Sequence, residues 1–333
     1  MTTTTQAAQA PRGPRVRFSA LGPLVALLLL MILGTLLNGN FLSIGNIANI
    51  VARSSFIGLI AIGATFVITS GGLDLSVGSM AAFIAGMMII IINSLVPSLG
   101  GGWGAVGIGI LAGLAIGSLG GAGNGLLVTV GRIEPFIVTL GTLGIFRALI
   151  TFLANGGTLN LNITASDTYS PLYSGKIFDI PVPIIIFAVV AIVAEIVMRR
   201  TTFGRHIGAI GSNEQVARYS AIKVDRVRLM TYVLQGVLVG AAAVLYVPKF
   251  GSANSSTAVL WELQAIAAVI IGGTTLRGGF GRIWGTVVGV IILELIGNIL
   301  NLQSFISPYL NQAFQGAIII IAVLLQRSRR TTS

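Results

Sequence analysis

Long stretches without any charged residue dominate the chain. Residues 75–131 contain none, and comparable apolar stretches recur between residues 20 and 326. A charged side chain at the centre of a bilayer costs about 2.5–3.5 kcal/mol on insertion scales, so charge-free runs of about 20 residues are typical of membrane-spanning helices. The stretch at 75–131 is long enough for two helices, divided at 93–104 by Asn, Pro and a run of glycines.

The same pattern over the whole chain predicts an all-α polytopic membrane protein with about ten transmembrane helices. We expect them near residues 20–37, 47–70, 75–95, 104–130, 135–155, 180–198, 228–248, 259–275, 283–300 and 309–326. A single membrane domain, residues 20–326, then lies between a disordered cytoplasmic tail (1–19) and a basic cytoplasmic tail (327–333). The first apolar run is interpreted as an uncleaved span, because no small-residue cleavage site closes it.

The basic residues give this arrangement an orientation. The chain has 20 Lys and Arg against 9 Asp and Glu. With ten alternating helices, Lys176 and Lys249 fall opposite the termini, and Arg53 and Arg147 fall within spans. Every other Lys and Arg then lies on the side of the termini, which the positive-inside rule makes cytoplasmic. The predicted topology is therefore N-in and C-in.

Two connections are long enough to do more than turn the chain. The external loop, residues 155–179, is polar and suits contact with an external protein, although a merely solvated loop is an equal alternative. The cytoplasmic loop, residues 199–228, is strongly basic and also carries Glu214 and Asp225. Its apolar residues recur at roughly helical spacing, which predicts a short helix beneath the membrane.

Two glycine-bearing interruptions stand out from the apolar runs. The first, GGLDLSVGS at 71–79, contains Asp74, and the second is GGTTLRGGFGR at 272–282. For Asp74 alone the favoured interpretation is an N-cap of the next helix. Paired interruptions in two halves also indicate broken helices that line a substrate path, although glycines can simply permit close helix packing. The candidate gate residues are Gly71, Gly72, Asp74, Ser76, Gly78, Gly272 and Gly273.

These segments resemble a known family. GGLDLSVGS, PFIVTLGTLGIFRAL at 135–149, FGRHIGAIGSNEQVARYSAIKVDRV at 203–227 and LQAIAAVIIGGTTLRGGFGRIWGT at 263–286 are similar to permease subunits of bacterial ABC sugar importers, the ribose/xylose/galactofuranose-type branch. The resemblance implies a type II importer-like fold in the bacterial inner membrane and transport of a monosaccharide. It also implies a second permease copy or sister permease, a cytoplasmic ABC ATPase that binds ATP and Mg²⁺, and a periplasmic or lipid-anchored sugar-binding protein.

The resemblance also assigns the cytoplasmic loop to contact with the ATPase. The residues implied for this coupling loop are Gly204, Arg205, Gly211, Asn213, Glu214, Ala217 and Ala221. Ala221 departs from the family, which commonly has glycine there, and Gln264 replaces a common Asp. The first departure is expected to stiffen the coupling turn, and the second removes a carboxylate.

Composition excludes several other classes of function. The chain has no Cys and a single His, so no metal site, Cys nucleophile or His-based triad is expected. Its basic residues sit at the ends of apolar runs rather than in a stripe on a soluble domain, which argues against nucleic-acid binding. No Lys is followed by Ser or Thr, so the chain lacks a phosphate-binding loop. We therefore expect no catalytic residue and no bound cofactor, with ATP hydrolysis on another chain.

A sugar path needs a few polar groups and an aromatic face in an apolar surrounding. The candidates are Asn124, Arg147, Trp261, Glu262, Glu294 and Asn298, for each of which a helix-packing role is at least as good an interpretation. Glu294 and Asn298 share a helix face, and a carboxylate there must be paired, protonated or hydrated. The alternative function is an ion-coupled secondary transporter or channel, but only Glu195 and Glu294 lie well within spans.

Overall fold

The computed structural model describes residues 22–302, 313, 316 and 317. The long helices are α1 (Gly22–Leu37), α2 (Ile44–Thr69), α3 (Val77–Leu99), α4 (Trp103–Thr129), α5 (Pro135–Leu153), α8 (Val182–Arg200), α11 (Val224–Phe250) and α13 (Ile283–Asn301). The shorter helices are α6 (Ile163–Tyr169), α7 (Pro171–Ser174), α9 (Thr202–Ser212), α10 (Glu214–Tyr219) and α12 (Trp261–Ile271). The fold is thus helical, as the apolar pattern predicts.

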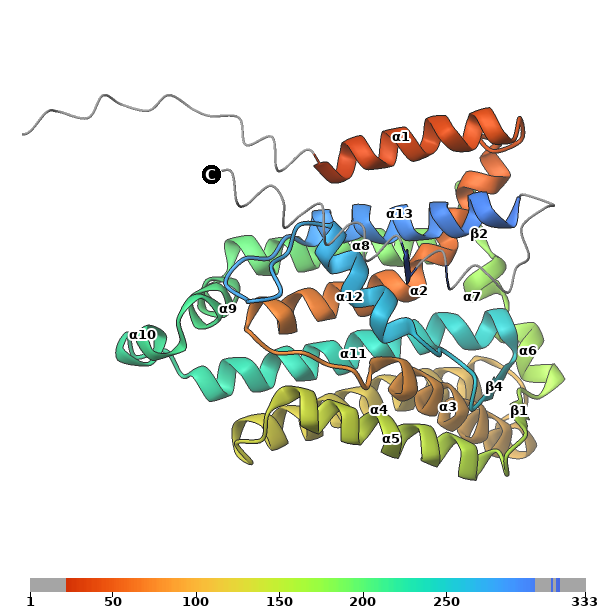
Figure 1. The fold of residues 1–333 in the computed structure, drawn as a ribbon. Helices are drawn as coiled ribbons and strands as arrows, with labels where there is room; N and C mark the ends of the chain where they lie inside the picture. The colour runs from red at the N-terminus through yellow and green to blue at the C-terminus, as the bar shows by residue number, and fades with distance from the viewer. Residues whose placement is uncertain (1–21, 303–312, 314–315, 318–333) are drawn as a thin grey trace, which may run out of the picture.

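Four short strands complete the described elements. β1 (Thr158–Asn160) pairs antiparallel with β4 (Ser252–Asn254), with Leu159 opposite Ala253. β2 (Lys176–Ile177) pairs with β3 (Ile180–Pro181) through a tight hairpin. In Figure 1 the long helices lie side by side, β1, β4 and α6 lie at one end of the bundle, and α9 and α10 lie at the other. We call these the strand end and the basic end.

Among the described residues, seven helices are long and apolar enough to cross a membrane: α2, α3, α4, α5, α8, α11 and α13. The predicted count of about ten is not confirmed. α1 and α12, at the first and eighth predicted spans, have 16 and 11 residues, and a perpendicular crossing of the hydrocarbon takes about 20. α12 is short because the chain leaves the helix at Gly272. The last predicted span, 309–326, lies almost wholly outside the described residues.

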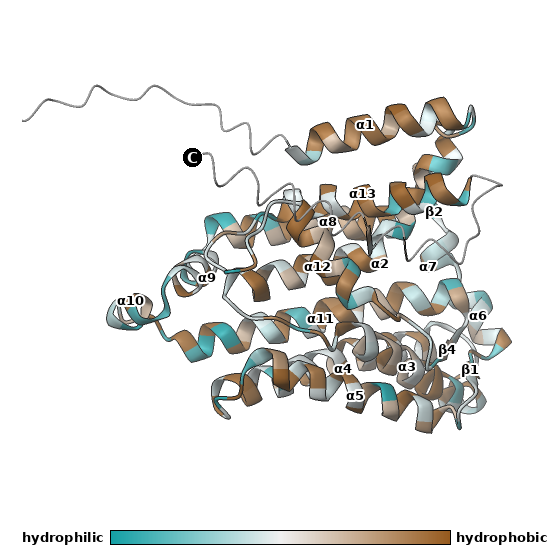
Figure 2. Ribbon diagram, in the orientation of Figure 1, coloured by the Kyte–Doolittle hydropathy of each residue, from teal (hydrophilic) through white to brown (hydrophobic). Residues whose placement is uncertain are grey.

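The core of the bundle lies between α2, α3, α11 and α12. α11 packs against α4, α2 and α3, whereas α13 packs against α2, α12 and α1. Fully buried side chains such as Ile60, Met80 and Val239 fill the space between them. The outer helices α1, α5 and α8 instead expose Leu, Ile and Phe, and Figure 2 shows hydrophobic colour along the sides of the bundle. Such an apolar exterior suits lipid as the surrounding solvent.

Glycines bring α4 and α11 into backbone contact. Gly113, Gly117 and Gly121 recur every four residues on α4; Gly117 and Gly121 face the backbone of α11 around Gly236, and the carbonyl of Gly113 lies against Gly240. A Cβ atom at Gly117 or Gly121 would overlap a carbonyl oxygen of α11. This arrangement gives the small-residue face that lets membrane helices pack closely without a hydrophobic driving force.

Both predicted interruptions are breaks in helices. α2 ends at Thr69, Gly71 has a φ of 85°, and α3 begins at Val77, whose first turn is buried inside the bundle. α12 likewise ends at Ile271, and Gly273 has a φ of 91°. Residues 70–76 therefore run from the basic end back into the bundle before α3 starts (Figure 1).

Candidate functional site

The segment between α2 and α3 is held by buried hydrogen bonds. The backbone N–H and the hydroxyl of Ser76 donate to Asp74 Oδ1 at 2.9 and 2.6 Å. The N-cap of α3 is Ser76, so the prediction that Asp74 is the N-cap is wrong. Asp74 instead closes the turn that leads into the helix, because its Oδ1 accepts from Ser76, two residues further on. Asn124 of α4 donates to Ser76 Oγ at 2.9 Å, and the Tyr232 hydroxyl of α11 donates to the Leu73 carbonyl at 3.1 Å.

Acceptor oxygens remain unpaired in this region. Asp74 Oδ2, Asn124 Oδ1 and Glu262 Oε2 are buried, and none has a hydrogen-bond partner in the part of the chain that the structure describes. Glu262, in the first turn of α12, lies directly against Gly78 of α3. Buried acceptors without partners are uncommon in folded proteins and favour a polar molecule that supplies donors.

Arg147 of α5 lies beside the same region. It donates to the carbonyl oxygens of Ser255 and Thr257 at 2.6 and 2.7 Å, so its charge is solvated by backbone rather than by a carboxylate. An open groove of about 650 Å³ passes it. The groove is lined by Leu143, Gly144, Arg147, Ala148, Thr151, Phe152, Asn155 and Gly156. We call Asp74, Ser76, Asn124, Arg147 and Glu262 the polar seam.

Trp261 belongs to an aromatic cluster. Its ring stacks on Phe56 at 5.9 Å and meets Tyr246 edge-on at 5.9 Å. On the far side of Phe56, Tyr173 stacks at 5.5 Å and accepts a hydrogen bond from Lys249 at 2.8 Å. Protein rings thus already cover part of the Trp261 surface, which was expected to face a sugar ring.

Glu294 and Asn298 lie between α2 and α13, apart from the polar seam. Glu294 pairs with Arg53 at 3.7 Å, and the side chains of Asn298 and Asn46 exchange two hydrogen bonds of 2.8 and 3.1 Å. Of the expected path residues, the structure thus brings together Asn124, Arg147 and Glu262. Glu294 and Asn298 instead link α13 to α2.

The predicted cytoplasmic loop folds as α9 and α10, followed by the first turn of α11. Thr201 caps α9 by accepting from Gly204 N, and Asn213 caps α10 by accepting from Val216 N. The capping residues explain why this basic segment is helical despite its charge. Figure 2 shows the polar colour gathered here at the basic end.

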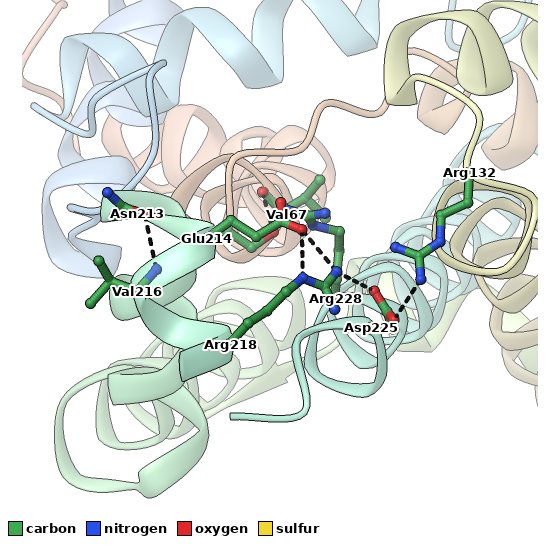
Figure 3. A network of polar contacts seen from close by, with 9 residues as sticks. Val67, Arg132, Asn213, Glu214, Val216, Arg218, Asp225 and Arg228 are labelled. Atoms are coloured by element: carbon green, nitrogen blue, oxygen red, sulfur yellow. Dashed lines mark hydrogen bonds and ion pairs between the residues drawn. The ribbon is translucent and has the colours of Figure 1, made fainter. Parts of the chain in front are cut away.

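A network of charges joins α10 to the helices of the bundle (Figure 3). Glu214 accepts from Arg218 and Arg228 at 2.9 Å each, and Asp225 accepts from Arg218 at 2.9 Å. Arg132, in the turn between α4 and α5, reaches Asp225 at 3.3 Å. Burial alone would raise the pKa of Glu214, but the bonds from the two arginines outweigh it and hold that pKa below its usual range.

The expected coupling residues divide between two faces. Arg205 and Asn213 are exposed and Glu214 is half-buried. Gly204 and Ala217 are buried, and Gly211 faces the end of α2, so these three pack inward. Packing, and not exposure, accounts for the small size of these three residues.

Ala221 occupies a left-handed backbone position with a φ of 58°. Ala221 N donates to Arg218 O and Ile222 N to Ala217 O, both at 3.1 Å. This pair of bonds is the Schellman ending of a helix, in which the left-handed position favours glycine. The left-handed backbone is therefore a structural reason for the glycine that the resemblance implies at this position.

Sequence reasoning missed several residues that position the site. Tyr232, Arg132 and the aromatic partners of Trp261 were not singled out. Aromatic residues inside a long apolar run carry no distinguishing signal of their own, and nothing near Arg132 in the sequence shows that it reaches Asp225. Arg53 was noted as a charge within a span, and this was a usable signal that it needs a partner.

Comparisons with known proteins identify the family. Residues 46–323 match the family described as "Branched-chain amino acid transport system / permease component". The chain is 39% identical over 313 residues to the ribose import permease protein RbsC of Bacillus subtilis (strain 168), covering 93% of each chain. It is 34% identical over 302 residues to the D-allose transport system permease protein AlsC of Escherichia coli (strain K12), covering 90% of this chain and 89% of the relative.

The L-arabinose transport system permease protein AraH of the same strain is 32% identical over 309 residues, covering 93% of this chain and 90% of the relative. All three similarities extend over nearly the whole chain, including the long apolar helices described above. The chain therefore belongs to this family of transport-system permease components, in the branch of ribose-type sugar importers.

Proposed function

We propose that this chain is the transmembrane subunit of an ATP-binding-cassette importer that moves a monosaccharide across the bacterial inner membrane. The observation that carries the proposal is the near full-length similarity to permeases named for ribose, allose and arabinose. A pentose or hexose of similar size is the substrate class. The chain itself makes and breaks no covalent bond, and alternating access moves the sugar inward.

The polar seam supports a sugar as the transported molecule. A monosaccharide carries several hydroxyl groups, each able to donate one hydrogen bond. Asp74 Oδ2, Asn124 Oδ1 and Glu262 Oε2 are buried acceptors that such hydroxyls would satisfy. Because the groups of the seam left unpaired among the described residues are all acceptor oxygens, the seam suits a solute that donates several hydrogen bonds, as a sugar does.

The basic end supports a separate ATPase as the motor. Arg205 and Asn213 are exposed on α9 and at the start of α10, and the charge network ties α10 to α11 and to the turn between α4 and α5. An ATPase bound to this surface in the cytoplasm could push several helices together. ATP and Mg²⁺ would bind to that partner, consistent with the missing phosphate-binding loop.

The strand end supports a second contact. The external loop carries β1, α6, α7 and β2, and the pairing of β1 with β4 fixes it to the segment before α12. A periplasmic or lipid-anchored sugar-binding protein would deliver its sugar here. A second copy of the chain or a sister permease would complete the transporter in the membrane, with both termini cytoplasmic.

Ion coupling, the alternative, has weaker support. An intramembrane carboxylate must be free to exchange a proton or bind an ion for that mechanism. Glu195 pairs with Arg199, and Glu294 pairs with Arg53, so both carboxylates noted in the predicted spans already have a basic partner. A proton would have to displace an arginine at each of these two positions. Asp74 and Glu262, each with one oxygen unpaired within the described part of the chain, are then the carboxylates that an ion-coupled mechanism would have to use.

Uptake into liposomes tests the proposal. The chain is reconstituted with an ABC ATPase and a sugar-binding protein from the same organism, and labelled ribose, allose, arabinose and leucine are offered with and without internal ATP. We expect uptake of at least one sugar that requires ATP and the binding protein. Sugar uptake that persists without ATP would show that the chain acts as a secondary transporter. Uptake of leucine alone would show that the substrate is a branched-chain amino acid and not a sugar.

A further inference from the structure

One residue of the cytoplasmic helix α9 lies at the meeting point of both broken helices. Gly211 lies against the carbonyl of Thr69, the last residue of α2, and against the backbone of Gly279. A Cβ atom at Gly211 would overlap both of these backbone groups. The absence of a side chain is therefore required by a close approach of three backbones.

The other contacts at this point come from the same segments. The N–H of Gly279 donates to the carbonyl of Thr69 at 2.9 Å, which joins the two interruptions directly. A Cβ placed at Gly278 would lie 3.0 Å from Gly71 N and 3.1 Å from Gly211 Cα. We call Thr69, Gly71, Gly211, Gly278 and Gly279 the glycine junction. In Figure 1 the connection between α12 and α13 lies beside α9, as these contacts require.

From the junction, one segment leads into the polar seam. Gly71 lies in the turn that ends α2, residues 72–74 have no regular secondary structure, and α3 begins at Val77 with a buried first turn. Asp74 and Ser76 are bonded to each other, and Ser76 is bonded to Asn124. A displacement of Thr69 and Gly71 would therefore reach the start of α3 through covalent backbone and hydrogen bonds.

A second segment leads from the junction toward α12. The connection turns tightly between Thr275 and Phe280, where Thr275 N donates to Phe280 O at 3.1 Å. α12 begins at its opposite end with Trp261 and Glu262, which lies against Gly78 of α3. The segment after α2 thus connects the junction with Asp74, and α12 connects it with Glu262, so both lead to buried acceptors of the polar seam.

We propose that the glycine junction is the point at which movement of α9 is passed to the polar seam, with α9 and the two interruptions moving as one body. The inference rests on the proposed function, since it needs an ATPase that moves α9. Gly211 is a positioning residue in this scheme, because its missing side chain faces the bundle and not the cytoplasm. Evidence for such coupling is a structural response both in α9 and in the two interruptions when ATP binds.

Hydrogen exchange on the unmodified transporter provides the first test. The complex of permease and ATPase in nanodiscs is compared without nucleotide and after trapping with ATP and vanadate. We expect amide exchange to change together in α9, in residues 70–76 and in residues 272–282. A change in α9 with no change in either interruption would overturn the proposal. Because it uses the native chain, this measurement does not depend on a variant that folds.

The second test compares two alanine variants one turn apart on α9. In G211A the new methyl group overlaps the junction, whereas in G208A the nearest atom is Gly279 O at an ordinary 3.5 Å. We expect G211A to lower sugar uptake per ATP hydrolysed by about tenfold or more, on the scale of known allosteric couplings. G208A should match the native ratio, and the complex yield and melting temperature of each variant are measured alongside.

The outcomes distinguish failure of the proposed function from failure of the proposed role of the glycine junction. If the native transporter shows no ATP-dependent sugar uptake, the proposed function fails, whatever the variants do. If native uptake depends on ATP and G211A retains the native ratio of uptake to hydrolysis, the junction proposal fails alone. If G211A does not assemble, the exchange experiment on the native complex decides.

Discussion

Arg53 and Glu294 form an ion pair of 3.7 Å between α2 and α13, within the apolar bundle. The Glu294 side chain is 19% exposed and that of Arg53 is 59% exposed, so the carboxylate is the more enclosed partner. Removing one member of an enclosed ion pair leaves the charge of the other without a counter-charge and destabilises the fold, whereas an exposed ion pair contributes little to folding stability.

The first prediction therefore concerns E294Q. Because Arg53 can still reach solvent or headgroups, we expect the loss of stability to fall between the values for exposed and buried pairs, about 1–3 kcal/mol. Thermal unfolding in detergent measures it. E195Q removes a pair of similar exposure that lies within one helix, α8, so it is the control for the link between helices and should cost about 0.5 kcal/mol or less. Equal effects of the two variants would contradict a contribution of the Arg53–Glu294 pair to the packing of α2 against α13.

The second prediction concerns the glycine contact of α4 and α11. In G121A a methyl group would overlap the Tyr232 carbonyl, so the helices must separate, at a cost of about 1–3 kcal/mol. G123A lies two residues further along α4, where no atom is within 4 Å, and should be nearly neutral. The yield and melting temperature of the purified variants check the difference. A G121A protein as stable as G123A would show that the two helices are not in backbone contact.

The third prediction concerns Ala221, whose left-handed backbone costs an L-residue about 1–2 kcal/mol. Glycine adopts this conformation freely, although it loses more entropy on folding. We expect A221G to raise the free energy of unfolding by about 0.5–1 kcal/mol, which chemical denaturation measures. The control is S220G, at the preceding residue, whose φ of −83° is ordinary, and it should not stabilise the protein. Destabilisation by A221G would contradict the Schellman ending.

The fourth prediction is a pH dependence. Because the pKa of Glu214 is lower in the folded protein than its usual value, its network stabilises the fold at pH values above the usual glutamate pKa. That contribution is lost as the pH falls through the lowered value. The difference in melting temperature between the native protein and E214Q should thus be constant near neutral pH and vanish in acid. A difference that grows on acidification would contradict the assigned bonds.

The fifth prediction separates the structural and transport roles of Asp74. D74A removes the acceptor for Ser76 N and Oγ, which should cost about 1–3 kcal/mol, the range for a buried donor left without a partner. D74N keeps one acceptor oxygen and should unfold closer to the native temperature. If the second oxygen of Asp74 binds a sugar hydroxyl, D74N will still lower uptake at unchanged complex yield. Normal uptake by D74N would remove Asp74 from the sugar path.

The apolar pattern predicted much of the fold because span length and lack of charge are local properties of the chain. It placed α2, α3, α4, α5, α8, α11 and α13 correctly, within a few residues. It did not foresee how short α12 is, since Gly272 lies within a continuous run of apolar and small residues. The pattern predicted the break but not the length of helix lost to it.

The candidate site was less predictable because its contacts join distant parts of the chain. Asn298 was expected to share a path-lining face with Glu294, but its partner is Asn46, 252 residues away. Gly211 was expected to contact the ATPase, and no local signal shows that it faces Thr69 and Gly279. Residue type marked these positions as unusual, and only the packing of helices shows what each one contacts.

The exchange of two hydrogen bonds between Asn46 and Asn298 fixes the axial register of α2 against α13. In this exchange each amide donates one bond and accepts the other, so sliding α13 by a single residue, about 1.5 Å along its axis, would lengthen both bonds together. The pair therefore opposes sliding of α13 along α2 and fixes which residues of the two helices lie side by side.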